Sequence, residues 1–241
     1  MTAIPAQVLE ELAPQGVLRV AINYGNPVLA QKGEDGLPQG VSVALAKALA
    51  QELGVQAQLI TFDAAGKVFA ALEQKTWDVA FLAIEPVRAE QIAFSEPYVI
   101  IEGTYLVAAD SPYVHVDDLD QPGLKLAVGK GAAYDLFLSR TLKHAQLERA
   151  ETSAGAVELF LARSLDAAAG VRQPLQQVAE RDPRYRVLES TFTEIRQAMA
   201  VPRPCVAGAA YVRDFVERKI NEGFVRAALA GSGQSDVTVA V

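Results

Sequence analysis

The sequence predicts an α/β protein made of two lobes. Strand-like apolar runs alternate with helix-like amphipathic segments along nearly the whole chain, which is the pattern of mainly parallel sheets with helices on both faces. The pattern occurs twice, and a chain of 241 residues is long enough for two lobes of about 100 to 120 residues each. No Ser/Gly-rich linker separates the halves, so we expect strands that cross between the lobes.

The first half has the pattern of a β-α-β-α-β unit. Ser42 is the expected N-cap of the first long helix, and Gly54 follows its last apolar residue as a C-terminal stop. Asp63 is the expected cap of the second helix. Strands are predicted at residues 17–22, 55–61 and 77–84, and helices at 42–54 and 63–72.

The second half repeats the alternation. Ser153 is the expected cap of one helix, and Pro174 opens another. Strands are predicted at 98–108, 124–128, 165–171, 185–190 and 195–202, and helices at 132–143, 153–163, 174–181 and 208–223. The long segment 98–108 is the expected outward crossing strand and 195–202 the return. Lobe 1 is therefore predicted to be discontinuous, with residues 1–102 and 199–241, and lobe 2 to comprise 103–198.

Composition excludes several classes of protein. The formal net charge is −7, which argues against a nucleic-acid binder or a basic membrane-surface protein, because both need a positive face. The single cysteine, Cys205, cannot form an intrachain disulfide. No apolar run reaches the roughly 18–20 residues of a membrane span.

The N-terminal segment leaves localisation open. Residues 1–16 contain neither a basic n-region nor an apolar h-region. A signal peptide was therefore either removed or never present.

Four predicted strand ends carry residues that suit ligand binding, since ligands of open parallel sheets bind beyond the carboxyl ends of the strands. The first strand ends in a polar turn that can also be an ordinary βα connection. Arg88 follows the third strand, and its planar fork of donors suits a carboxylate, although a lone loop arginine is commonly a solvated charge. The candidates at the four ends are Asn23, Tyr24 and Asn26; Glu85 and Arg88; Lys130; and Val171 and Arg172.

The turn around Lys130 indicates a small-anion site or simply a tight turn. Lys130 is followed by Gly131 and not by Ser or Thr, so the segment is not a Walker-type phosphate loop. Tyr134 occupies the third glycine position of a dinucleotide fingerprint. Arg172 lies at the turn between the strand predicted at 165–171 and the helix that Pro174 opens. There it can either add a second positive charge to the site or lie on the surface.

The sequence offers little for catalysis or metal binding. His115 and His144 are the only histidines, and both are expected at the surface. There is no GxSxG nucleophile elbow, no HExxH and no Cys/His cluster with metal spacing. We therefore expect no catalytic residue, no metal and no cofactor.

Taken together, the segments resemble the family 3 solute-binding proteins of ABC importers, which have the type II periplasmic-binding-protein fold. The resemblance covers nearly the whole chain and is most specific in "FLAIEPVRAEQIAFSEPY", residues 81–98. It implies two lobes joined by two crossing strands as a hinge, a ligand captured by lobe closure, and Arg88 as the group that grips the ligand carboxylate. It also implies a monomer, an ABC permease as partner and a periplasmic or extracellular location, although a cytoplasmic one stays open.

The departures from the family pattern concern the ligand. The family's Gly and Thr before the arginine correspond to Phe81 and Ala83, and its two stacking aromatics correspond to Asn26 and Ala65. Its Gly-Thr or Thr-Thr pair in lobe 2 corresponds to Ala132 and Ala133, which leaves only backbone donors.

The acidic residue that pairs with a ligand ammonium in the family should fall at Val171 or Arg172, and neither can accept a hydrogen bond from an ammonium. We infer from this that the ligand is a small carboxylate-bearing anion and not a standard α-amino acid. Glu85 or Glu102 remains able to accept an ammonium.

Two alternatives remain at this level. One is a dehydratase-like enzyme on the same scaffold, with Glu85 and Glu102 as the only candidate general acids. The other is a ligand-sensing module that works without transport, which the absence of a recognisable signal peptide keeps open.

Overall fold

The computed structural model describes residues 4–240, and its chain divides into two compact units. Unit 1 comprises Met1–Asp63, Lys67–Ile100 and Arg196–Val241, and unit 2 comprises Ala64–Gly66 and Ile101–Ile195. The fold is thus the two-lobed α/β architecture that the sequence predicts, with a discontinuous first lobe.

Unit 1 is built on a mainly parallel sheet. Its strands lie in the order β4 (Gln56–Phe62), β1 (Val17–Asn23), β5 (Val79–Ala83) and β11 (Thr193–Pro202). The first three are parallel and β11 runs antiparallel to β5. All five residues of β5 are buried, as expected of a central strand with both faces covered.

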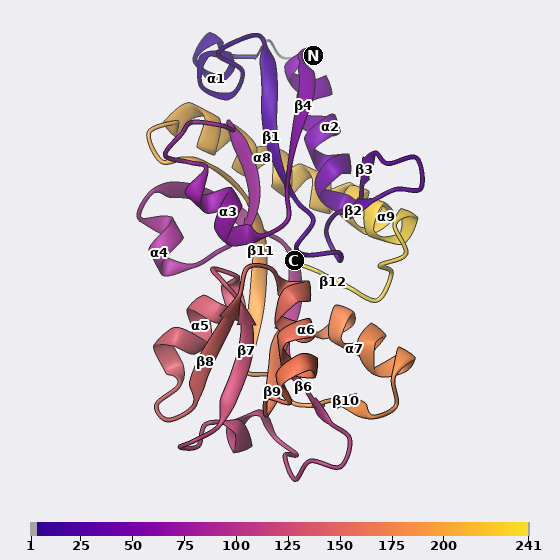
Figure 1. Cartoon of the computed structure of the whole chain (residues 1–241). Coiled ribbons are helices and arrows are strands. Elements are labelled where there is room, and N and C mark those ends of the chain that lie inside the picture. Colours follow the sequence, from indigo (N-terminus) through magenta and orange to yellow (C-terminus); the bar gives the residue numbers. More distant parts are fainter. Residues whose placement is uncertain (1–3, 241) are drawn as a thin grey trace. The chain divides into compact units, whose positions relative to one another are not determined.

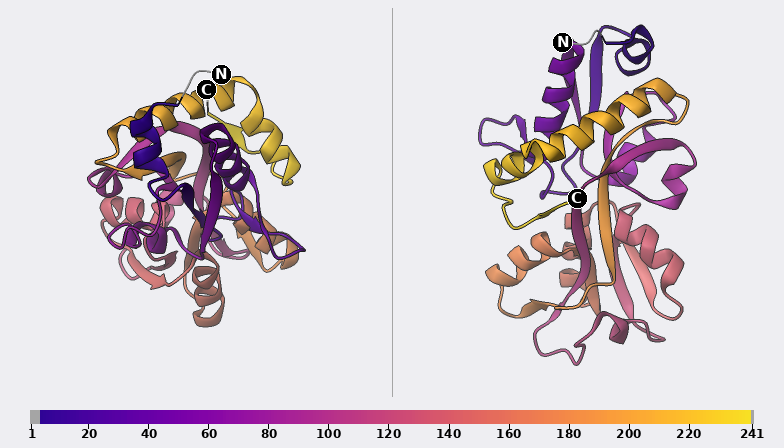
Figure 2. Two further views of the ribbon diagram at one scale, coloured as in Figure 1. Left: turned by 90° about the horizontal axis from the view of Figure 1, so that it is seen from above. Right: turned by 180° about the vertical axis from the view of Figure 1, so that it is seen from behind.

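Helices pack on this sheet with their apolar sides inward. Helix α2 (Val41–Leu53) buries Leu45, Leu49 and Leu53. In Figure 2, right, α8 (Val206–Asn221, orange-yellow) runs across the strands of unit 1, and it also packs against α1 (Ala6–Leu12) and α9 (Phe224–Gly231). The short helices α3 (Ala65–Ala70) and α4 (Pro86–Ala89) follow β4 and β5.

In unit 2, the strands β6 (Ile92–Ala108), β9 (Ala167–Val171), β7 (Lys125–Gly129) and β8 (Gln146–Ala150) are neighbours in that order (Figure 1). Strands β7, β8 and β9 are parallel, and β6 is antiparallel to β9. Its helices are α5 (Ala133–Thr141), α6 (Ser153–Arg163), α7 (Arg172–Arg181) and the 3-10 turn η1 (Val116–Leu119), and β10 (Tyr185–Val187) pairs with β6.

Strands β6 and β11 contribute residues to both units. The crossings predicted from sequence, at residues 103 and 198, fall within these two strands. Strand β6 begins earlier than the predicted segment 98–108, because Pro97 stays within an extended backbone and does not interrupt it.

Two predicted helix caps were wrong. The N-cap of α2 is Gly40 and not Ser42: Gly40 has φ 111°, and a Cβ there would lie 2.5 Å from the Leu29 carbonyl oxygen, so glycine is required. The cap of α6 is Thr152 and not Ser153, with the Thr152 hydroxyl accepting a hydrogen bond from Gly155 N at 2.9 Å. Gly54 ends α2 in the left-handed conformation, as predicted.

The short elements were not predicted, since they bury too few residues to produce a periodic pattern. They are α1, the hairpin β2 (Gln31–Lys32) and β3 (Pro38–Gln39), α4, η1, β8, α9 and β12 (Thr238–Val239). Within residues 4–240, no helix is both long enough and apolar enough to cross a membrane.

Candidate functional site

Arg88 is held in a short helix directly after the buried strand β5. Glu85 lies in extended backbone at the N-cap position of α4, and Pro86 occupies the first helical turn, where its missing N–H removes no hydrogen bond. The turn redirects the chain so that the Arg88 side chain is 1% exposed. An arginine that the sequence allowed to be a solvated charge is therefore buried.

The Arg88 guanidinium is fixed by its own strand. Its Nη1 donates to the carbonyl oxygen of Ala83 at 3.0 Å. Burial lowers the pKa of Arg88 to about 10, and the nearby Glu85 carboxylate acts in the opposite direction. Arg88 therefore keeps its positive charge at neutral pH, beside a carboxylate that is itself only 7% exposed.

Phe81 and Ala83, predicted as ligand contacts, lie in the buried interior of unit 1. The Phe81 ring meets the Tyr98 ring edge-on, with centroids 6.0 Å apart. Phe81 and Ala83 are each 3% exposed. The Phe81 side chain therefore packs in the core of unit 1. Ala83 positions Arg88, because its carbonyl oxygen accepts the Arg88 hydrogen bond.

The polar turn after β1 is folded on itself. The Asn23 side chain accepts from Gly25 N at 2.8 Å, and the Asn26 side chain accepts from Val28 N at 3.3 Å. Asn26 is 8% exposed, whereas Asn23 and Tyr24 are partly exposed. The two asparagine side chains therefore stabilise the turn. Within residues 4–240, the Tyr24 side chain makes no comparable hydrogen bond to the turn.

Ala65, predicted at the position of an aromatic contact, is the first residue of α3 and is partly exposed. The ion pair between Asp63 and Lys67, at 2.7 Å, flanks it.

In unit 2, the turn between β7 and α5 already uses several of its backbone donors. Lys130 N donates to Ala150 O, Gly131 N to the Asp135 carboxylate and Ala132 N to Gly129 O, at 2.8, 2.8 and 3.1 Å. Ala132 is the N-cap and Ala133 the first residue of α5. The N–H groups of the first turn of a helix have no acceptors within it, so donors for an anion begin at Ala133.

The cationic side chains of unit 2 have acidic neighbours. Lys130 Nζ lies 3.8 Å from Glu151 Oε1, and both side chains are well exposed. Arg172 Nε donates to Glu102 Oε2, while its Nη1 and Nη2 donate to the carbonyl oxygens of Leu188 and Glu189 at 3.0 and 2.8 Å. Val171, which ends β9, is partly exposed.

The acidic neighbours change the charge of the predicted site. Arg88, Lys130 and Arg172 each lie near a glutamate: Glu85, Glu151 and Glu102 in turn. The role of Glu151 was missed, because Glu151 and Lys130 come from the ends of the neighbouring strands β8 and β7 and β8 was not predicted. The net positive charge around these three cations is therefore smaller than a count of the cations alone predicts.

Comparisons with known proteins agree with this architecture. The family model described as "Bacterial extracellular solute-binding proteins, family 3" matches residues 18–225. A glutamine-binding protein of Geobacillus stearothermophilus is 26% identical over 198 residues, which are 80% of this chain and 75% of that protein. An L-cystine-binding protein of Escherichia coli strain K12 is 30% identical over 140 residues, 56% of this chain and 52% of that protein.

Among solved structures, the cysteine-binding protein of Campylobacter jejuni superimposes with a TM-score of 0.83 at 20% identity, covering 96% of this chain and 99% of that one. At that identity the similarity establishes the fold alone.

Proposed function

Because the chain belongs to the bacterial extracellular solute-binding proteins of family 3, we propose that it captures a small carboxylate-bearing solute for an ABC importer and does not transform it chemically. The relatives named above are binding proteins. The proposed location is outside the cytoplasmic membrane, which cell fractionation checks.

The observation that carries the proposal is the buried, charged Arg88. A buried arginine is costly unless its charge and its N–H groups are matched. Ala83 O and Glu85 are among the groups of the protein that match it, and a ligand carboxylate is a bidentate partner of opposite charge that an arginine suits well. A carboxylate anchor explains an arginine at this position better than a stabilising role does, because buried ion pairs are weak sources of stability.

The finer proposal is that the ligand is anionic and lacks an α-ammonium group. By the family resemblance, Val171 and Arg172 correspond to the position of the acid that pairs with a ligand ammonium. The Arg172 N–H groups are directed to carbonyl oxygens and to Glu102. In this proposal the anion also contacts Lys130 and the N–H groups at the start of α5. The Tyr24 ring packs against the ligand.

A zwitterionic amino acid is the second candidate, and Glu102 favours it. The Glu102 side chain is 49% exposed although it accepts from Arg172, so one of its lone pairs can receive an ammonium. Relatives named for glutamine and cystine agree with this candidate.

A thermal-shift and calorimetry panel separates the two candidates. It compares the standard α-amino acids with dicarboxylates and 2-oxo-acids, and a ligand at 100 times its Kd should add about 2.7 kcal/mol to the free energy of unfolding. Stabilisation by oxo-acids or dicarboxylates alone supports the anionic ligand. Stabilisation by an amino acid with none by these anions contradicts it, and stabilisation by no carboxylate contradicts the proposed function.

The proposal includes a conformational step, closure of the two units on the ligand with β6 and β11 as the hinge. These strands qualify because each contributes residues to both units, and hinges are commonly a few residues of such connections. A fall in the radius of gyration on adding the ligand, measured by small-angle X-ray scattering, is expected. An unchanged radius at saturation contradicts closure.

A further inference from the structure

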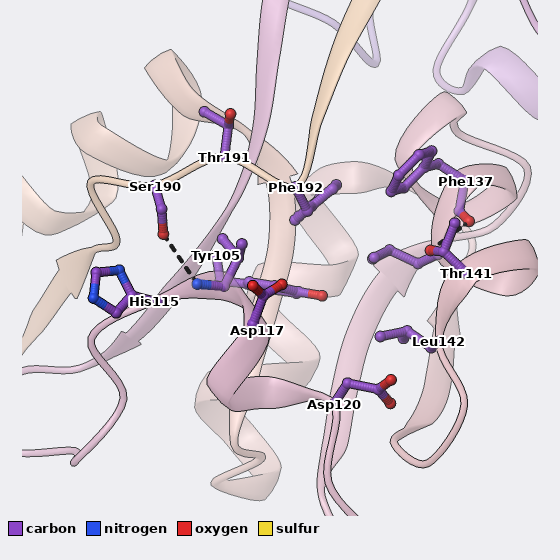
Figure 3. A pocket seen from close by; sticks show the side chains of 12 residues that line it. Tyr105, His115, Asp117, Asp120, Phe137, Thr141, Leu142, Ser190, Thr191 and Phe192 are labelled. Atoms are coloured by element: carbon purple, nitrogen blue, oxygen red, sulfur yellow. Dashed lines mark hydrogen bonds between the residues drawn. The ribbon is translucent and has the colours of Figure 1, made fainter.

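Unit 2 contains a cavity that none of the predicted ligand residues lines. Its volume is about 400 Å³, and its lining residues lie between Tyr105 and Phe192, all within unit 2 (Figure 3). Its walls are β6, η1, the C-terminal half of α5 and the segment 190–192. Small-molecule sites typically measure about 300 to 1,000 Å³, so the size suits a compact ligand.

Aromatic rings form one wall of the cavity. The Phe192 ring contacts the Tyr105 ring, with centroids 4.8 Å apart, and stacks near the Phe137 ring at 6.0 Å. Phe137 and Phe192 are only partly buried, and Figure 3 shows their side chains pointing toward one another, with Leu142 beneath Phe137. These side chains can pack against an apolar ligand body.

Tyr105 lines this cavity, and although the residue is only 1% exposed, its hydroxyl is not among the side-chain atoms that are closed off from solvent without a partner. Within residues 4–240 this hydroxyl makes no side-chain hydrogen bond to another residue, so it is available to a ligand in the cavity. Burial raises the pKa of Tyr105, and the charges of Asp120 and Asp117 raise it further, so both carboxylates act on this hydroxyl and keep it protonated.

Asp117 and Asp120 are the two acidic side chains among the residues that line the cavity, which also include His115. Burial acts to raise the pKa of Asp120, but hydrogen bonds from the backbone N–H groups of Ala145, Lys143 and His144 hold it below its usual value. Its charge is thus fixed at neutral pH. Asp117 lies in η1 at the rim of the cavity and is exposed.

A cation already lies close to this aromatic wall. The Arg140 guanidinium carbon is 5.9 Å from the centroid of the Phe137 ring, which is within the range of cation–π attraction. Since Arg140 occupies part of that ring, the preference for a bound positive charge must come mainly from Asp117, Asp120 and Tyr105.

We propose that this cavity is a second binding site, selective for a small organic cation with an apolar, preferably aromatic, body. The ligand ammonium donates to the Tyr105 hydroxyl and faces Asp117 and Asp120, while its body packs against Phe137 and Phe192. A water molecule takes up about 30 Å³ of liquid, so the cavity has room for roughly a dozen non-hydrogen atoms. The site lies in unit 2 and does not involve Arg88.

The test is an NMR titration of the isotope-labelled protein with phenethylammonium. Phenylacetate, of similar size and opposite charge, and the neutral phenethyl alcohol are the matched probes. Phenethylammonium should shift the amide signals of Val116, Thr141 and Phe192, and phenylacetate should leave them in place. Equal binding of phenylacetate, or shifts confined to other residues, overturns the proposal.

Two variants test the contacts. Tyr105→Phe removes only the hydroxyl and should weaken phenethylammonium binding about threefold to tenfold, and Asp117→Asn should weaken it about threefold. Unchanged affinity in both variants overturns the proposal. Arg88→Ala should retain phenethylammonium binding, and its loss there would assign the probe to the site of the proposed function.

Discussion

Arg88 Nη1 donates a hydrogen bond to the carbonyl oxygen of Ala83, five residues earlier, at 3.0 Å. The bond joins the short helix α4 back to the last residue of β5 and fixes the guanidinium at the carboxyl end of that strand. Because the acceptor is a backbone carbonyl, it does not depend on the side chain at position 83. An alanine there is therefore compatible with a well-positioned arginine.

Replacing Arg88 by alanine should weaken ligand binding strongly. The ligand carboxylate would lose its charged partner in a site from which water is excluded. Such a loss typically costs about 2 to 4 kcal/mol of binding free energy, or about 30- to 1,000-fold in Kd. Isothermal titration calorimetry with the best ligand of the panel measures this. Arg226→Ala, which removes an exposed arginine of α9, is the matched control and should leave Kd unchanged. An unaltered Kd in Arg88→Ala removes Arg88 from the site.

The order of strands and helices could be predicted because it follows from local apolar periodicity. Strand β5 and helix α2 are examples: one is a continuous apolar run and the other has apolar residues at helical spacing. The helix start at Gly40 could not be predicted, because the Leu29 carbonyl oxygen that requires a glycine there comes from a preceding loop.

The candidate site was predictable only in part, for the same reason. Arg88 stands out because it follows a buried strand. The partner of Arg172 does not, since Glu102 lies 70 residues earlier and only the pairing of β6 with β9 brings the two together. Charge balance in a site depends on such distant pairs, so a count of local charges overestimates the positive charge.

Replacing Glu102 by glutamine should shift the preference of the site toward anions. The substitution keeps the size of the side chain but leaves the Arg172 charge without its carboxylate partner. The Kd of an anionic ligand should fall, and that of a zwitterionic amino acid should rise, each by about threefold, because Glu102 is half-exposed and solvent screens its charge. Parallel titrations with an oxo-acid and its parent amino acid measure the ratio. A ratio equal to that of the wild type excludes Glu102 and Arg172 as determinants of ligand charge.

Asp78 should be needed for stability and not for binding. Its carboxylate is 5% exposed and accepts from the backbone N, Nε and Nη2 of Arg19, at 3.0, 3.0 and 2.6 Å. Asp78→Ala leaves these donors unsatisfied and should lower the free energy of unfolding by about 2 to 3 kcal/mol. Urea denaturation measures it.

The control for Asp78 is Asp214→Ala. Asp214 also pairs with an arginine, Arg218, at 2.8 Å, but its side chain is 67% exposed. Exposed pairs contribute about 0 to 1 kcal/mol, so this variant should unfold almost as the wild type does. Equal losses in the two variants would show that burial of Asp78 is not the cause.

The contact between α2 and α8 should make unit 1 sensitive to acid through Glu52. Arg218 Nη2 donates to Glu52 Oε1 at 2.6 Å, and the Tyr211 hydroxyl donates to the same oxygen at 2.7 Å. The Arg218 hydrogen bond lowers the pKa of Glu52, burial opposes it, and the Tyr211 bond adds to the lowering.

A carboxyl whose pKa is lower in the folded than in the unfolded state stabilises the fold above its unfolded pKa, about 4.3 for glutamate, and loses that contribution as the pH falls through the folded pKa. Glu52→Gln should therefore lower the free energy of unfolding by up to about 1 kcal/mol near pH 7, since Arg218 is partly exposed. The difference from the wild type should shrink steadily below about pH 4. Urea denaturation across that pH range measures it, and a difference that stays constant with pH would mean that Glu52 acts through packing and not through its charge.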